Sequence, residues 1–544
     1  MLSPPVFLKP LFLSVLSGLL LWLGWPVSGM AGLLFVGFVP VLLLEQGFSE
    51  RIIKRKRQGL FGYFYLAFFI WNLGTTWWIY NSTGVGAVLA LGCNTLFMTL
   101  IWLLFHITKI KLGNATGYIS LIVYWIAFEK IHLDWDLSWP WLTLGNGFAS
   151  NVKWIQWYEY TGILGGSMWI LLANILLFLL IKKWIAVKNL KSVAVTVKEK
   201  IDFPVLYCAI ALILFPILFS EIMYAGYKEK TAPCNVVVVQ PNIDPYNEKF
   251  NGSEANQVAK LLALSSTEVD SATDYLVAPE TALPNGVWED EIHNALGIKT
   301  IKAFIHTFPQ LTFIGGLSSL KAYKNRENIP LTARKFDKSE MYFDAFNSAM
   351  QLDEGDSIQL YHKSKLVPGV EKMPYPAIFG FLENYAISLG GTSGSLGMQK
   401  ERTVFTSAKG VKVAPAICYE SIYGDFLSGY IRNGAQLIFI ITNDGWWGNT
   451  PGYKQHAAYG RLRAIEFRRS IARSANTGIS CFINQRGDVE QPTPWWTEEV
   501  IKAKLNKNDV LTFYGLHGDF IGWLCLAASV LMLLWVVISR WTKE

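Results

Sequence analysis

Charged residues are scarce in this sequence. Asp, Glu, Lys and Arg make up 16% of its 544 residues, whereas 52% are hydrophobic and the mean hydropathy is +0.29. A soluble globular protein carries about 25% charged residues. The shortage of charge therefore argues against a soluble protein and favours a membrane protein.

Cysteine pairs and closely spaced metal ligands are also missing. The 6 Cys form no Cys-x-x-Cys pair, and the 7 His form no His-Glu-x-x-His motif. The sequence therefore predicts neither a zinc site nor a dense set of disulfides, and we expect no metal and no cofactor. The net charge of +7 is not gathered into a basic stripe with stacking aromatics. We therefore expect no nucleic-acid partner.

Long apolar runs, by contrast, are plentiful. A helix that crosses a bilayer needs roughly 20 mainly apolar residues. Eight windows approach this length, near residues 11–25, 31–44, 59–80, 84–107, 118–128, 164–181, 203–224 and 520–538. The first window has few positive charges before it and further windows follow at once. We therefore expect an uncleaved anchor there rather than a signal peptide.

Basic residues follow every second window. Clusters of Lys and Arg lie at 51–57, 109–111, 182–200 and 540–543. Since cytoplasmic loops are enriched in Lys and Arg, this pattern predicts that both termini are cytoplasmic and that the polar stretch between the last two windows lies on the outer face. We expect a membrane bundle at 1–227, a polar domain at 228–513 and a C-terminal transmembrane helix at 514–544.

The polar stretch combines strand-like and helix-like patterns. Short β-rich runs lie at 236–240, 275–278, 311–315, 349–352, 411–417, 437–442 and 479–483, and helix-like segments at 292–308, 422–433 and 457–470. Strands that alternate with helices predict an α/β layered domain. The Gly-, Pro- and Ser-rich stretch at 367–399 is too long for a plain connection, and we interpret it as a lid.

Three polar side chains stand near the ends of apolar runs, where an α/β domain exposes a site. Burial of Glu280 after the run at 275–278 is expected to raise its pKa and make it a general base. Lys363 is suited to steady an oxyanion, and Cys418 precedes a predicted helix whose N-terminus favours a thiolate. Taken singly, each has a plainer interpretation: a surface carboxylate, a solvated lysine and an inert buried cysteine. Cys234 and Cys481 are interpreted as core residues.

In this order, Glu280, Lys363 and Cys418 resemble the Glu-Lys-Cys triad of the nitrilase superfamily. The apolar windows on both sides narrow the resemblance to the apolipoprotein N-acyltransferase family, and it extends over nearly the whole chain. The supporting motifs are Val-Gln-Pro-Asn at 239–242, Phe-Asn-Ser at 346–348, Ile-Thr-Asn-Asp-Gly-Trp-Trp-Gly at 441–448, Arg-Leu-Arg-Ala-Ile-Glu at 461–466 and Arg-Ser-Ala-Asn-Thr-Gly at 473–478.

The resemblance implies a fold and a set of site residues. The fold is an integral membrane α-helical bundle of about eight transmembrane helices with an inserted α/β nitrilase-like αββα sandwich domain. Glu280 is then the base, Lys363 the oxyanion stabiliser and Cys418 the nucleophile. The implied supporting or substrate-binding residues are Glu371, Tyr419, Glu420, Asn347, Trp446 and Trp447.

This sequence departs from the family pattern at a few positions. Lys365 stands where the family has a His, and Phe250 stands where it has a Trp. Gly369 and Val370 replace a Phe-Gly pair before Glu371. The three triad positions are unaffected by these changes.

The resemblance also implies an activity. Enzymes of this family move a fatty acyl chain from a phospholipid, through a cysteine thioester, to the N-terminal amine of a diacylated apolipoprotein, the last step of lipoprotein maturation. The expected partners are therefore a phospholipid donor, this acceptor and membrane lipid. The expected location is the bacterial inner membrane, with the catalytic domain on the periplasmic side.

Other interpretations of the residues stay open. A membrane-tethered carbon-nitrogen hydrolase or amidase would use the same triad, with water as the second nucleophile. A Cys-His hydrolase would rely on His362 or His456 instead. A membrane scaffold with a degenerate domain is less compatible with three intact triad positions.

Overall fold

The computed structural model describes residues 9–27, 29–50, 58–188, 202–323, 329–336, 341–375 and 395–541. The chain forms two compact units. The first unit consists of Met1–Trp77, Ala87–Gly226 and Asp519–Glu544, and the second of Trp78–Gly86 and Tyr227–Gly518. We call them the helical unit and the catalytic unit.

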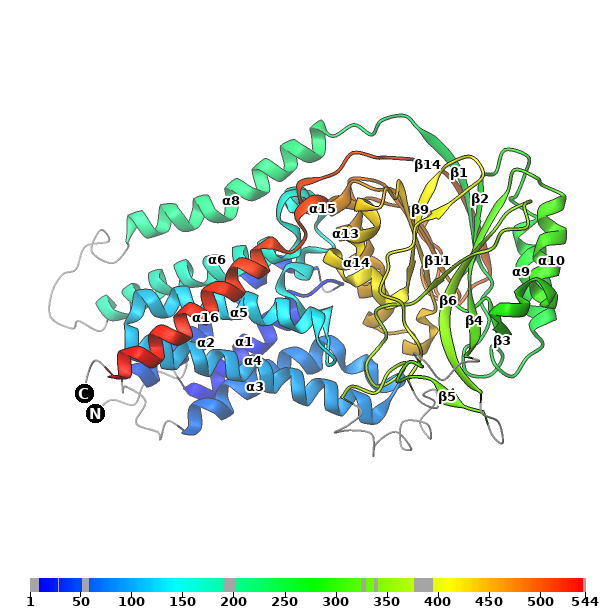
Figure 1. Ribbon diagram of the computed structural model, residues 1–544. Helices are drawn as coiled ribbons and strands as arrows, with labels where there is room; N and C mark the ends of the chain where they lie inside the picture. The colour runs from blue at the N-terminus through cyan, green and yellow to red at the C-terminus, as the bar shows by residue number, and fades with distance from the viewer. Residues whose placement is uncertain are drawn as a thin grey trace. The chain divides into compact units, whose positions relative to one another are not determined.

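The helical unit is built from long apolar helices (Figure 1). They are α1 Pro10–Leu23, α2 Val39–Ser49, α3 Gln58–Thr76, α4 Gly84–Leu112, α5 Asn114–Asp134, α6 Tyr158–Lys188, α8 Phe203–Gly226 and α16 Phe520–Trp541. Within the described residues, five segments are long and apolar enough to cross a membrane: Ala31–Ser49, Gly84–Leu112, Tyr158–Val187, Phe203–Gly226 and Phe520–Ser539. These segments support a membrane part, while a total of about eight spans stays a prediction.

Lipid-facing character is clearest in α8 and α16. Both helices expose large apolar side chains, among them Ile222 at 71% and Leu531 at 67%. Water would disfavour such faces, whereas acyl chains would not. The basic clusters at 51–57 and 189–200 lie outside the described residues, so the orientation expected from them stays a prediction.

The fifth window looked short in the sequence because polar residues end it. In the structure α5 continues to Asp134 and carries a buried Glu129 and a buried Lys130. Glu129 Oε1 accepts hydrogen bonds from Trp125 Nε1 at 2.9 Å and from Leu144 N at 2.8 Å. Partners of this kind allow a polar group to remain inside an apolar helix bundle.

The catalytic unit contains two sheets. The first has the order β14-β1-β2-β4-β6-β5, with β3 paired to β4 and β7 to β6. Its strands are β1 Pro233–Gln240, β2 Tyr275–Val277, β3 Leu283–Trp288, β4 Thr312–Tyr323, β5 Arg334–Lys335, β6 Tyr342–Leu352, β7 Gln359–His362 and β14 Glu499–Asn506. Strands β1, β2 and β4 run parallel. Helices α9 Glu254–Ser265 and α10 Leu296–His306 bury apolar side chains such as Leu261 and Ile301 against this sheet.

The second sheet has the order β13-β12-β11-β10-β9-β8. Its strands are β8 Phe405–Thr406, β9 Lys412–Ile417, β10 Leu437–Thr442, β11 Ile471–Ala475, β12 Cys481–Ile483 and β13 Val489–Glu490. Helices α13 Gly424–Arg432 and α14 Pro451–Phe467 pack against this sheet. The two sheets face each other: the rings of Tyr275 and Phe439 lie 5.1 Å apart, and Ser474 Oγ donates to Val239 O at 2.9 Å. This arrangement confirms the predicted αββα sandwich (Figure 1).

Two details differ from the sequence expectations. Helix α3 ends at Thr76, and the aromatic segment Trp78–Gly86 belongs to the catalytic unit, although the third window was expected to reach residue 80. Most of the predicted lid, at 376–394, lies outside the described residues. The described flank at Glu371 is considered below.

Candidate active site

Glu280 stands just beyond β2, on a turn that needs a glycine beside it. Gly316 N on β4 donates to Pro279 O at 3.0 Å. A Cβ atom on Gly316 would lie 2.3 Å from Thr281 N and 2.8 Å from Glu280 Cα. Only glycine therefore lets β4 pass this close under the turn.

Lys363 follows β7 directly and is buried against two carboxylates. Its main-chain N–H donates to Asn347 O at 2.8 Å, which extends the pairing of β7 with β6. Its ammonium Nζ donates to Glu280 Oε1 at 3.2 Å and to Glu371 Oε1 at 2.8 Å. The side chain is 1% exposed, so these charges interact with little screening by water.

Asn347 joins the same two carboxylates. Its Nδ2 donates to Glu280 Oε1 at 2.7 Å and to Glu371 Oε1 at 2.9 Å. Val367 N donates to Glu371 Oε2 at 2.8 Å. The structure thus brings together four of the residues expected at the site, and Lys363 and Asn347 each donate to both carboxylates.

The second sheet completes the environment of Glu280. Asn443 follows β10, and its main-chain N–H donates to Glu280 Oε2 at 3.0 Å. Both oxygens of the carboxylate are therefore engaged, one from each sheet. The sequence singled out the motif around Asn443 without assigning this contact.

Cys418 occupies the turn after β9 with a left-handed backbone, at φ 49°. Its carbonyl accepts from Ser421 Oγ at 2.7 Å and from His456 Nε2 at 3.2 Å. His456 Nδ1 in turn lies 3.0 Å from Asp444 Oδ1, and Arg473 Nη2 donates to Asp444 Oδ2 at 2.6 Å. A strained non-glycine conformation persists where its surroundings fix it, and here buried side chains do so.

The pKa directions at the triad differ from those expected. Burial raises the pKa of Cys418, and the charge of Glu280 raises it further, while Lys363 lowers it. Burial also raises the pKa of Glu280, but Lys363, Asn347 and Lys249 together bring it below its ordinary value. For Lys363 the two carboxylates overcome burial and raise the pKa well above its ordinary value. Glu280 is therefore ionised, and Cys418 is a thiol.

Glu420 holds two segments of the site together through hydrogen bonds. Glu420 Oε2 accepts from Ile417 N at 2.9 Å, and its Oε1 accepts from Tyr361 Oη at 2.5 Å and from Ser364 N at 2.7 Å. This carboxylate therefore links the Cys418 turn to β7 and to the residue that follows Lys363. Burial raises the pKa of Glu420 to about 7.

Tyr419 is buried, and its ring meets Tyr423 edge to face at 5.2 Å. Lys365, which stands where the family has a His, contacts the Tyr423 ring: its Nζ lies 4.8 Å from the ring centre. Gly369, another position where the sequence departs from the family pattern, has φ 79°, a conformation that glycine adopts easily.

Trp446 and Trp447 lie in an aromatic cluster. The ring of Trp446 contacts Tyr246 at 5.1 Å and stacks on Phe250 at 6.3 Å. The ring of Trp447 contacts Trp78 at 4.9 Å, and Asn81 Nδ2 donates to Trp447 O at 2.8 Å. Tyr246 and Phe250 are half exposed, so the cluster has an accessible apolar surface.

The two histidines of the alternative site have other partners. His362 Nε2 lies 2.6 Å from Glu289 Oε1, and its ring stacks on Phe346 at 4.1 Å. The two ring nitrogens of His456 contact the Cys418 carbonyl and the Asp444 carboxylate, as described above. Both histidines are thus placed to hold neighbouring groups in position.

Cys234 and Cys481 are 1% exposed and lie in β1 and β12. Burial raises their pKa values to about 12 and about 11. Both are core residues, as interpreted from the sequence.

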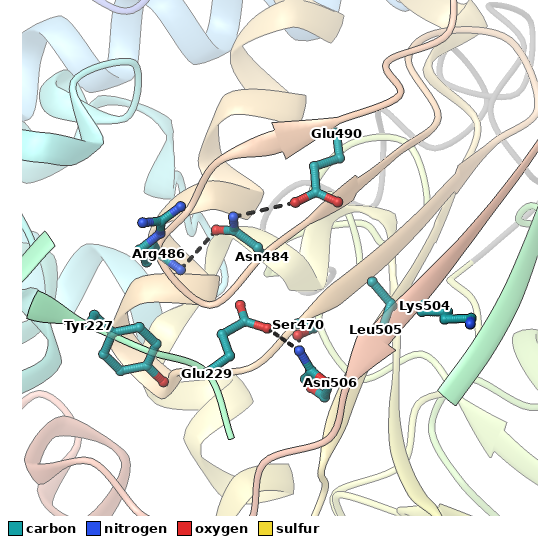
Figure 2. A pocket seen from close by; sticks show the side chains of 9 residues that line it. All are labelled: Tyr227, Glu229, Ser470, Asn484, Arg486, Glu490, Lys504, Leu505 and Asn506. Atoms are coloured by element: carbon teal, nitrogen blue, oxygen red, sulfur yellow. Dashed lines mark hydrogen bonds between the residues drawn. The ribbon is translucent and has the colours of Figure 1, made fainter. Parts of the chain in front are cut away.

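A polar cavity of about 270 Å³ lies elsewhere in the catalytic unit (Figure 2). Its lining residues are Tyr227, Glu229, Ser470, Asn484, Arg486, Glu490, Lys504, Leu505 and Asn506, and no triad residue is among them. Several of its polar groups bond one another: Asn506 Nδ2 donates to Glu229 Oε2 at 2.9 Å, and Asn484 Nδ2 to Glu490 Oε1 at 3.4 Å. Within the described residues, no group of three or more His, Cys, Asp or Glu is placed to hold a metal ion.

Lys249 was not singled out in the sequence. It is 2% exposed, and its ammonium donates to the main-chain oxygen of Glu280 at 2.8 Å. The one feature of the sequence that could have drawn attention to Lys249 is its position next to Phe250, where the sequence departs from the family pattern.

Comparisons with known proteins agree across both units. Residues 17–176 match the family model of the apolipoprotein N-acyltransferase N-terminal domain, and residues 235–513 match that of carbon-nitrogen hydrolase. An apolipoprotein N-acyltransferase of Chlorobaculum tepidum is 32% identical over 98% of this chain and 97% of its own length. Proteins of the same name from Geobacter metallireducens and Thermotoga maritima are 28% and 23% identical over 96% and 99% of this chain and 94% and 95% of their own lengths. Matches of this extent show that the chain belongs to the apolipoprotein N-acyltransferase family.

Proposed function

We propose that this chain transfers a fatty acyl group from a phospholipid to the N-terminal amine of diacylglyceryl-cysteine lipoproteins through a thioester on Cys418. Its family makes it a membrane-embedded acyltransferase that acts on lipoproteins. The observation that carries the mechanism is the buried pair of Glu280 and Lys363, whose charges act on the Cys418 thiol.

The first step loads the enzyme. Glu280 takes the proton of Cys418, and the sulfur attacks the ester carbonyl of the phospholipid. Lys363 and the Tyr419 main-chain N–H stabilise the resulting oxyanion. When the intermediate collapses, the glycerol oxygen leaves with the proton from Glu280. The products are a thioester and a lysophospholipid.

The second step discharges the acyl group. The lipoprotein amine attacks the thioester, and Glu280 accepts a proton from the attacking nitrogen. Collapse of this intermediate breaks the carbon-sulfur bond and forms an amide. The Cys418 sulfur then regains the proton from Glu280, so the site returns to its starting state.

The aromatic cluster supports transfer rather than hydrolysis. An apolar surface around Trp446 would exclude water from the thioester and favour lipid-linked substrates. Donor and acceptor are both anchored in lipid, so a catalytic unit attached to membrane helices meets them at high local concentration. The alternative function is a hydrolase that uses the same residues. The match of residues 235–513 to the carbon-nitrogen hydrolase model is compatible with this alternative.

The proposed location is the bacterial inner membrane, with about eight spans, cytoplasmic termini and the polar domain of residues 228–513 in the periplasm. The alternation of basic clusters along the sequence supports it. A periplasm-active reporter fused after Gly252 should be active, and one fused after Arg57 should be inactive. The opposite pattern would refute this orientation.

Product analysis separates the two activities. The full-length enzyme is given labelled phospholipid and a diacylated lipopeptide with either a free or a blocked N-terminus. We expect label on the free lipopeptide and none on the blocked one. Free fatty acid released at the same rate with and without acceptor would indicate a hydrolase instead.

A further inference from the structure

A second buried lysine lies beside Glu280, and the proposed steps leave it without a role. The ammonium of Lys249 donates to Glu280 O at 2.8 Å, and within the described residues it forms no ion pair with a carboxylate. Burying an ammonium without an ion-pair partner carries a large desolvation cost. Such a group is costly as a packing element, and its place in the site therefore points to an electrostatic role.

The main chain around Lys249 holds it in place. Lys249 N donates to Asp244 O at 2.9 Å and closes the turn that follows β1. Gln257, buried on α9, donates through Nε2 to Lys249 O at 2.9 Å and to Glu248 O at 3.2 Å. The ammonium therefore reaches Glu280 from a backbone that is clamped to a helix.

The charges of the site balance only if Lys249 is protonated. Glu280 and Glu371 carry two negative charges, and Lys363 carries one positive charge between them. Burial lowers the pKa of Lys249 to about 8, although Glu280 and Cys418 act to raise it. Lys249 can therefore lose its proton just above neutral pH, whereas Lys363 keeps its own.

Other charged groups near this region are paired or lie at the surface. Asp444, just after β10, is paired with Arg473. On the turn itself, Glu248 is exposed and Asp244 is half-buried, so water screens their charges. The unbalanced negative charge therefore belongs to Glu280 and Glu371.

We propose that Lys249 is a positioning residue for acyl transfer, whose ammonium holds the Glu280 main chain and keeps the site neutral, so that the Glu280 carboxylate stays ionised and available to the Cys418 thiol. This role rests on the proposed function. During the reaction one negative charge moves from Glu280 to sulfur and then to the oxyanion, and a second nearby cation stabilises it at each stage. Without that cation, the pKa of Glu280 would rise, and the negative charge on the sulfur and on the oxyanion would be less well stabilised.

The variants separate charge from hydrogen bonding. Lys249→Arg keeps the charge, Lys249→Gln keeps a donor without charge, and Lys249→Met keeps neither. Lys260→Met is the control, because Lys260 forms a surface pair with Glu498 at 2.8 Å in the same unit. Thermal unfolding of each full-length variant in detergent checks the fold. If Lys249→Met is unstable, the comparison of Lys249→Arg with Lys249→Gln still separates charge from hydrogen bonding.

The first readout is independent of acyl transfer. Iodoacetamide alkylation of Cys418 near pH 7.5, followed by peptide mass analysis, reports the thiolate. We expect the Arg variant and the control to match the wild type, and the Gln and Met variants to be about tenfold slower, as for a pKa change of about one unit. Equal rates for Arg and Gln would overturn the inference, since only the hydrogen bond would then matter.

The second readout is the pH profile of Cys418 acylation by phospholipid in a single turnover. The wild-type rate should fall on the alkaline side near pH 8, where Lys249 loses its proton. Arginine should move this fall upward by more than one unit, and Gln should move the acid limb upward because Glu280 becomes easier to protonate. Unchanged limbs would contradict the inference. If neither the wild type nor any variant is acylated, but alkylation still separates Arg from Gln, the proposed function fails, while the electrostatic effect of Lys249 on Glu280 and Cys418 stands.

Discussion

The two units bury ionised side chains in different ways. In the helical unit, Glu45 on α2 accepts from Lys109 on α4, and its other oxygen lies 2.7 Å from His106 Nδ1. Lys109 also donates to Gln46 Oε1 at 2.7 Å. These charges face one another and link two helices, a structural use of a buried ion pair.

In the candidate active site of the catalytic unit, the buried charges are not paired one to one. Lys363 is shared by Glu280 and Glu371, and the Lys249 ammonium donates to the main-chain oxygen of Glu280. A neutral thiol lies within reach of these charges, which act on its pKa. Burial alone therefore does not mark a functional site. A nucleophile set among incompletely paired charges does.

Removing a triad member should cause the largest loss. Cys418→Ala, Glu280→Gln and Lys363→Met should each reduce turnover by about a thousandfold or more, because members of one catalytic unit act together. Steady-state transfer to a lipopeptide measures it, with Lys260→Met as the control. Near-normal activity of Glu280→Gln would show that Glu280 is not the general base.

Moving Glu280 without changing its charge should cause a smaller loss. Gly316→Ala places a methyl group 2.3 Å from Thr281 N and must displace the Glu280 turn. A misplaced base should lower turnover by about a hundredfold. Gly355→Ala, where the new methyl group meets only the Asp353 carboxylate at 3.2 Å, is the matched control. Equal activities of the two variants would show that the position of this turn is unimportant.

The contact of His456 with the Cys418 carbonyl should have a modest effect. His456→Ala removes one hydrogen bond from a strained turn, worth about 1 kcal/mol, so turnover should fall by about tenfold or less. Cys418→Ala assayed in parallel gives the comparison. A loss as large as that of Cys418→Ala would instead revive a Cys-His mechanism.

Breaking the buried pair of the helical unit should leave turnover intact. Lys109→Met strands the Glu45 carboxylate and should destabilise the protein by about 3–5 kcal/mol. Thermal unfolding in detergent should show this loss, while turnover per folded molecule stays at the wild-type value. A specific loss of turnover without destabilisation would place this pair in the catalytic cycle and erase the difference between the units.

The sequence located the site better than it described its chemistry. Glu280, Lys363 and Cys418 stand after apolar strands, and such ends are visible in a sequence. The direction of the Glu280 pKa was wrong, because the sequence does not show that Lys363, Asn347 and Lys249 surround the carboxylate. Desolvation acts on a single residue, whereas these opposing effects come from distant parts of the chain.

The missed elements have similar causes. Strand β11 was not predicted, because Arg473 and Ser474 interrupt its apolar pattern; both are buried with partners supplied by Asp444 and Val239. Trp78 was assigned to a membrane window since its apolar character resembles that of α3. Lys249 lies in a turn without any periodic pattern, so only its tertiary contacts distinguish it from a surface lysine.

The proposed mechanism requires that Cys418 carries an acyl group after exposure to donor lipid. The decisive measurement is intact-mass analysis of the full-length protein incubated with phospholipid alone, followed by peptide mapping and hydroxylamine treatment. We predict one added acyl chain on Cys418, cleaved by hydroxylamine, absent in Cys418→Ala and discharged by a diacylated lipopeptide with a free N-terminus. An enzyme that transfers acyl chains while Cys418 stays unmodified, or while Cys418→Ala remains active, would contradict the account.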